Sequence, residues 1–312
     1  MELSISLTCF TASYVVALFL EVTRLFFRSG IRGAVMLLFA GAGLVAHSWY
    51  LVLLAIDSQQ GGTPLSSWFG LYLIAAWILA ASYLYFTYHH TRQSIGIFIL
   101  PIVLGLIGVA YSFNSLEAPA TEDSRGLWLI VHVASLVLGT VVVSIGFVAG
   151  LMYLLGSWQL KNKSPESGVR LPSLEWCESV NARSLTISTL CVAIGLGAGL
   201  VRNIDLLRFD SPAGLAWGDP VVWSSGLLLL WLVTAVVFRA AYRPARQGHK
   251  VAYLTVVSFL LLALVTALIV LVPSAHQPET AVEKSKTTAG RLERVATIGP
   301  EQGPLDRRGR AA

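Results

Sequence analysis

The sequence predicts an all-α fold, a polytopic membrane bundle of about eight transmembrane helices. Composition is the first reason: 55% of the 312 residues are hydrophobic and only 12% are charged, whereas a soluble domain carries about 25% charge. The second reason is the length of the apolar stretches, which approach the roughly 20 residues that a membrane-spanning helix needs. The sequence lacks the interleaving of basic and aromatic residues that would favour nucleic acid as a partner.

Eight apolar stretches qualify as spans, with ends defined to within a few residues. Their expected ranges are 3–27, 33–56, 67–88, 94–113, 128–155, 184–202, 220–240 and 251–273. The first has no basic segment before it, so we expect a membrane helix there and not a cleaved signal peptide. The sixth is the weakest, because glycine, serine and threonine interrupt it. Small residues such as Gly195, Gly197 and Gly199 indicate close helix packing.

Basic residues divide the connections between these spans into two sets. One set holds twelve lysines and arginines and the alternate set holds three. The positive-inside rule then places both termini outside the cell's inner (cytoplasmic) membrane, although seven further basic residues follow the last span.

Two connecting or terminal segments have their own expected structure. Within 156–182, Leu174, Cys177 and Val180 recur at helical spacing, which fits either a short interfacial helix or a plain linker. Residues 277–312 are polar and should form a disordered tail. We expect residues 1–276 to form the membrane domain. The three cysteines have no CxxC spacing and favour neither a redox nor a zinc site.

Three histidines lie inside or at the edge of predicted spans, namely His47, His132 and His276. Imidazole is costly in lipid unless it meets a partner, a cavity or a ligand, and it is a common axial ligand of haem iron. The predicted topology places His132 and His276 at the outer face, with His47 deeper in the second span. His89, His90 and His249 fall at the cytoplasmic side, where solvated loop positions explain them; these three complete the histidines.

An aromatic loop, Ala-Trp217-Gly-Asp219-Pro-Val-Val-Trp223, falls on the same outer face. Indole rings offer flat surfaces for a porphyrin. Each feature also has an ordinary structural explanation. A lone intramembrane histidine often bonds to a neighbouring helix, and tryptophans are common at membrane interfaces. Their convergence on one face favours a haem site.

At these segments the chain resembles the cytochrome c assembly family, membrane proteins of the CcsA, CcmC and HemX type. Residues 43–51 resemble the family's early histidine segment, and 127–155 resemble its helix that opens with Trp and His. Residues 171–184 resemble the connection before its sixth helix, and 251–276 resemble its last helix, which closes on a histidine.

The resemblance implies roles for six residues. The axial haem ligands would be His132 and His276, which would also be the metal ligands. The porphyrin would be held by Trp217, Asp219 and Trp223. His47 would serve haem passage across the bilayer. The bound group would be a b-type haem held transiently.

The aromatic loop departs from the family's full motif, Trp-x-Trp-Asp-Pro-(Lys/Arg)-Glu-x-Trp. The chain keeps Asp219 and Pro220 but has Val221 and Val222 where a base and an acid are expected. This departure makes the chain look closer to the HemX-like branch. The chain also carries no large extracytoplasmic domain, so a second cytochrome c assembly chain is an expected partner.

The expected function is therefore haem binding or presentation in cytochrome c assembly, without chemical transformation of the haem. The sequence shows no recognisable catalytic constellation, so we expect no enzymatic activity. Two alternatives stay open. One is a membrane regulator or scaffold of haem biosynthesis without bound haem, and the other is a small-molecule transporter. Membrane lipid is an expected contact in all three.

Overall fold

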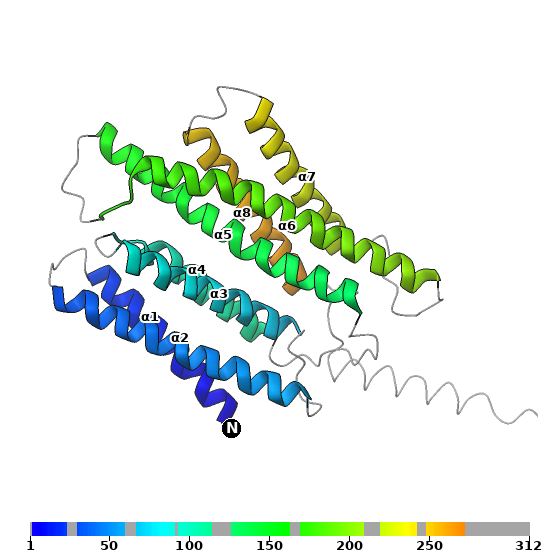
Figure 1. The fold of residues 1–312 in the computed structure, drawn as a ribbon, viewed down its shortest axis with the longest axis horizontal. Helices are drawn as coiled ribbons and strands as arrows, with labels where there is room; N and C mark the ends of the chain where they lie inside the picture. Colours follow the sequence, from blue (N-terminus) through cyan, green and yellow to red (C-terminus); the bar gives the residue numbers. More distant parts are fainter. Residues whose placement is uncertain are drawn as a thin grey trace, which may run out of the picture.

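A computed structural model describes the chain as a bundle of α-helices (Figure 1). It describes residues 2–23, 30–59, 67–90, 93–113, 126–162, 169–208, 219–241 and 248–271. Within these ranges the elements are α1 (Glu2–Thr23), α2 (Gly30–Gln59), α3 (Trp68–His89), α4 (Gly96–Ser112), α5 (Leu127–Lys161), α6 (Leu174–Arg208), α7 (Pro220–Ala241) and α8 (Gly248–Leu271). The described part contains no strand, and the predicted all-α class is confirmed.

Six of these helices are long and apolar enough to cross a membrane, judged by length and composition among the described residues. The other two, α1 and α4, contribute shorter apolar stretches, Leu7–Thr23 and Gly96–Ser112. At 1.5 Å per residue, the 17 residues of α4 span about 26 Å, slightly less than the roughly 30 Å hydrocarbon core. The chain is therefore a multi-pass membrane protein.

The helices form two groups of four that follow one another along the sequence. Helix α1 packs on α2 and α4, and α3 packs on α2 and α4. In the second group α5 packs on α6 and α8, while α7 packs on α6 and α8. Contacts of α5 with α3 and α4 join the groups, as the succession of helices in Figure 1 shows.

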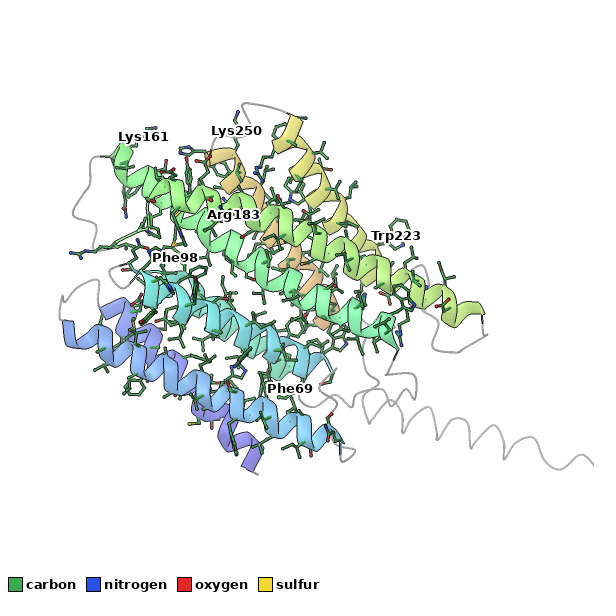
Figure 2. All side chains as sticks on the ribbon, viewed as in Figure 1. Phe69, Phe98, Lys161, Arg183, Trp223 and Lys250 are labelled. Carbon is green, nitrogen blue, oxygen red and sulfur yellow. The ribbon has the colours of Figure 1, made fainter. Side chains whose placement is uncertain are left out.

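Consecutive helices run in opposite directions, so the bundle has two ends. Helices α3, α5 and α7 begin at the end where α2, α4, α6 and α8 finish (Figure 1). We call this the His132 end, because His132 lies on the second turn of α5. Lys161, at the last turn of α5, and Lys250, at the first turn of α8, mark the opposite end (Figure 2).

The long helices α5 and α6 differ from their predicted ranges. Each has 35 residues, and α6 includes the segment from Leu174 to Val180 that the sequence suggested as a separate interfacial helix or a linker. That segment is the first part of α6, and Cys177 on it is fully buried. The sixth predicted span, 184–202, was thus too short at both ends, because its polar residues face other helices instead of interrupting the helix.

A buried acid holds the first helix group together. Glu21 on α1 is fully buried, and its Oε1 accepts a hydrogen bond of 3.2 Å from the backbone N–H of Gly96. Gly96 is the first residue of α4, where backbone N–H groups lack partners inside the helix. The N-cap residue Ile95 offers no side-chain hydrogen bond, so Glu21 supplies the acceptor from the neighbouring helix. An acidic side chain is also favourable near the N-terminus of a helix, where the helix dipole is positive.

Candidate functional site

His132 lies in the interface between α5 and α6, and its ring contacts two glycines of α6. Its Nδ1 is 2.7 Å from the carbonyl oxygen of Gly195. A Cβ atom on Gly199 would lie only 2.6 Å from Nδ1 and 2.8 Å from Cε1 of the ring. Gly199 therefore forms a seat for the ring that only a residue without a side chain can provide, whereas Gly195 contributes its backbone carbonyl and leaves space for Leu136.

The hydrogen bond to Gly195 determines which ring nitrogen carries the lone pair. A carbonyl oxygen only accepts, so Nδ1 must carry the proton that it donates. The neutral imidazole then has its lone pair on Nε2, which is the atom that coordinates a metal ion. A metal-ligating histidine usually donates its other N–H to such an acceptor, which fixes both tautomer and orientation. His132 therefore has the geometry of a preoriented ligand.

Asp219 and Trp223 lie at the start of α7, at the same end of the bundle. Asp219 is the N-cap: its Oδ1 accepts a 2.7 Å hydrogen bond from the N–H of Val221, and Pro220 occupies the first helical position. This accounts for the Asp-Pro pair by helix physics alone. Trp223 is 72% exposed, and Figure 2 shows it on the outside of the bundle at this end.

His47 is fully buried in α2, away from the α5–α6 interface. Its ring stacks on Phe10 of α1 with centroids 4.2 Å apart and planes 2° from parallel. Its Nδ1 lies 3.4 Å from the hydroxyl oxygen of Tyr14, and the backbone of Leu73 on α3 is nearby. Within the described residues Nε2 makes no hydrogen bond of ordinary geometry, and the Leu73 backbone is the polar group that interacts with the ring from α3.

The structure brings some of the predicted site residues together and leaves others apart. His132 and Trp223 share one end of the bundle, with Asp219 at the base of α7. His47 lies between α1 and α2, in the other helix group. Trp217 and His276 fall outside the described residues, so the proposed second axial ligand and one indole remain predictions.

The remaining histidines lie at helix ends and not in the expected loops. His89 is in the last turn of α3, with Nδ1 2.9 Å from the carbonyl oxygen of Tyr85. His90 packs edge-on against Trp176 of α6. His249, in the first turn of α8, contacts the Ser157 hydroxyl. They stabilise the end of the bundle opposite His132, which agrees with a role unrelated to the proposed site.

Three residues of α6 that lie near the His132 contact along the helix were not among the predicted site residues. The glycines Gly195 and Gly199 were attributed to helix packing alone, although their spacing of four was the signal for a seat on one helix face. Arg202 follows Gly199 by three residues, so it lies on the same face of α6 one turn closer to the helix end. Its side chain is half-buried.

Among the described residues no group of three histidine, cysteine or acidic side chains could hold a metal ion. The three cysteines are all free. A site for a metal bound only by protein side chains therefore has no support in this part of the chain. Haem needs fewer protein ligands, because the porphyrin supplies four of the iron's bonds.

The fold and these positions define a class: a multi-pass helical membrane protein with histidines placed within and at one end of its bundle. Residues 37–276 match the Cytochrome C assembly protein family, a range that includes all six predicted site residues. The chain belongs to this family, and its role is in cytochrome c assembly at a membrane.

Curated relatives agree with the family assignment. The chain is 26% identical to the "Cytochrome c biogenesis protein CcsA" of Guillardia theta over 64% of this chain and 71% of that protein. It is 25% identical to the protein of the same name from Thermosynechococcus vestitus, over 70% and 76%. The Gloeobacter violaceus protein of that name is 21% identical over 80% and 85%. No solved structure matches the chain. The expected closeness to the HemX-like branch stays a prediction.

Proposed function

We propose that the protein binds haem as its cargo at the His132 end of the bundle and presents it for cytochrome c assembly. The observation that carries this proposal is the orientation of His132. The Gly195 carbonyl fixes the Nδ1–H tautomer, so the lone pair that would ligate the iron is on Nε2.

The second axial ligand in this proposal is His276, which follows the end of α8 by five residues. Helix α8 packs on α5, so the chain after Leu271 starts within the helix group that carries His132. The indoles of Trp217 and Trp223 would cover the porphyrin faces. Asp219 contributes by starting α7 at the correct place, and the Arg202 cation would pair with a haem propionate.

His47 has a separate role in this proposal, as a deeper ligand on the route of haem. Its Nε2 lacks a hydrogen bond of ordinary geometry within the described residues, and its ring is flanked by Phe10. If Nδ1 donates its proton to the Tyr14 oxygen, Nε2 carries the lone pair that iron requires. The flat stack on Phe10 fixes the ring plane without competing for the iron.

A carrier must release its cargo, so the protein would bind and present haem without transforming it. The positive-inside distribution of charge favours a position of the His132 end on the outer face of the cytoplasmic membrane. Apocytochrome and a second assembly chain would meet the haem there.

Haem staining of cytochromes c tests this function in cells that depend on this protein for their assembly. Replacement of His132 or His276 by Ala should abolish the haem-stained cytochromes while membrane levels of the protein stay normal. Imidazole in the medium should partly restore them, because it can occupy the vacated ligand position. Full assembly with both histidines replaced would exclude the proposed ligands and favour a scaffold or transport role.

A further inference from the structure

A cavity of about 460 Å³ opens between α6, α7 and α8, toward the end of the bundle opposite His132. Its walls include Glu178, Ala182 and Thr186 of α6, Val236 and Arg239 of α7, and Val251 of α8. The cavity thus contains one acid and one base on otherwise small or apolar walls. Neither charge has a role in the proposed haem site.

Arg239 is held in place by the opposite wall of the cavity. Its Nη1 donates to the carbonyl oxygen of Ala182 at 2.8 Å and approaches the Thr186 hydroxyl at 3.4 Å. A guanidinium carries five N–H donors in a planar fork, so this contact orients the group while using one of its nitrogens. Within the described residues no hydrogen bond or ion pair joins Arg239 to Glu178. The two charges face the same space without neutralising one another.

The two charges follow a definite order in depth. Helix α6 begins at Leu174, so Glu178 lies about 6 Å closer to the membrane surface than Ala182, one helical turn further along. Arg239 is bonded to Ala182 and therefore lies deeper than Glu178. Helix α7 runs the opposite way, which places Val236 almost one turn deeper than Arg239. From the surface inward the cavity presents Glu178 and then Arg239, with Thr186 and Val236 deeper still, while Val251 in the first turn of α8 gives an apolar wall near the surface.

The length of α6 indicates that the charged groups of the cavity lie at the level of the lipid headgroups. Its 35 residues span about 52 Å, well beyond the roughly 30 Å hydrocarbon core. If the excess of about 22 Å is shared equally between the two ends, about the first seven residues of α6, which include Glu178, lie at the level of the headgroups. This argument holds for either orientation of the protein in the membrane.

We propose that this cavity binds the headgroup of one phosphatidylethanolamine molecule. That lipid presents an ammonium outermost, a phosphate beneath it and acyl chains deeper still, which is the order of Glu178, Arg239 and Val236. The guanidinium fork suits phosphate oxygens, and the carboxylate suits a primary ammonium. A purely anionic headgroup would leave Glu178 facing a negative charge. The quaternary ammonium of phosphatidylcholine has no N–H to donate to Glu178.

Native mass spectrometry of the full-length protein in detergent tests the proposal. The protein is titrated separately with phosphatidylethanolamine, phosphatidylglycerol and phosphatidylcholine. The wild type should retain phosphatidylethanolamine most strongly. Arg239→Gln should lower its retention about tenfold, since a charge-assisted hydrogen bond of about 1.4 kcal/mol corresponds to that factor. Glu178→Gln should remove the preference over phosphatidylglycerol.

Exposed residues of the same chemical types on α6 serve as matched controls. Arg183 and Glu175 are both exposed and neither lines the cavity, so Arg183→Gln and Glu175→Gln should bind lipid like the wild type. Arg239→Lys keeps the charge and should retain part of the binding, which provides a second variant if the Gln substitution prevents folding.

Several results would overturn the proposal. Retention of phosphatidylethanolamine by Arg239→Gln equal to that of Arg183→Gln would remove the site. Preferential binding of phosphatidylglycerol that increases in Glu178→Gln would show a site for acidic lipids instead. Displacement of the lipid by inorganic phosphate as readily as by soluble phosphoethanolamine would show a site for free anions.

Discussion

Gly199→Ala should displace the His132 ring and weaken haem binding without removing any ligand atom. The new Cβ would lie 2.6 Å from Nδ1, whereas uncrowded contacts begin near 3.5 Å. The ring must then retreat by about 1 Å, which stretches the 2.7 Å hydrogen bond to Gly195 beyond the usual limit. Loss of such a partner of a metal-ligating histidine typically lowers metal affinity about 10-fold to 100-fold.

The effect on stability should be smaller than the effect on haem. An interhelical hydrogen bond in a membrane contributes about 0.6 kcal/mol, and overpacking costs about 1–3 kcal/mol. Replacement of a helical glycine by alanine offsets this destabilisation by up to about 1 kcal/mol, because alanine has the higher helix propensity. Gly197→Ala is the matched control, because its Cβ would meet nothing within 4 Å and it gains the same helix propensity.

Haem titration of both purified variants, with the thermal midpoint measured in the same detergent, compares them directly. Haem affinity should fall in Gly199→Ala and stay at the wild-type value in Gly197→Ala. Equal affinity in the two variants would refute the idea that the glycine seat orients a haem ligand, even if the thermal midpoint of Gly199→Ala changed.

Four further changes test other parts of the account. His47→Gln keeps a donor and an acceptor for the Tyr14 hydroxyl, so the thermal midpoint should stay unchanged. Haem loading should fall, because an amide is a poor iron ligand. Full haem loading would show that His47 serves packing only. Asp219→Ala should destabilise α7 by about 1 kcal/mol in thermal unfolding, because the helix loses its N-cap. Asp219→Asn keeps an equivalent N-cap and should bind haem normally. Loss of haem in the Asn variant would assign the carboxylate a direct role in haem binding. Arg202→Gln should lower haem affinity about tenfold through loss of a charge-assisted bond of about 1.4 kcal/mol, and unchanged affinity would exclude a propionate contact. A cysteine at Gly61 should react with an impermeant label in intact cells and one at Ser164 only after permeabilisation; the reverse pattern would invert the predicted topology.

The all-α class and most helix positions followed from hydropathy, because lipid permits few structures other than helices and a span has a known length. Hydropathy failed at the start of α6. There the polar residues Asn181 and Ser184 are buried against other helices, so the helix continues for ten residues before the predicted start at 184. Burial between helices is a tertiary property that a window of sequence does not contain.

The candidate site was predictable in its residue types but only partly in its geometry. The high free-energy cost of an imidazole in lipid identifies His47 and His132 as candidate site residues in the sequence. It does not show that His47 of α2 packs against α1 while His132 of α5 packs against α6. Asp219 was read as part of a haem loop, although an Asp before a Pro also predicts the start of a helix, and the structure shows that cap. The glycine seat was missed because it appears only when α5 and α6 are packed together.

The absorption spectrum of the purified, haem-loaded protein tests the central claim most directly. The wild type should show a Soret band with the sharp visible bands of a low-spin haem held by two histidines. His132→Ala should lose that spectrum, and added imidazole should restore much of it. A wild-type spectrum in His132→Ala, at equal haem content and without imidazole, would contradict the claim that His132 ligates the haem iron.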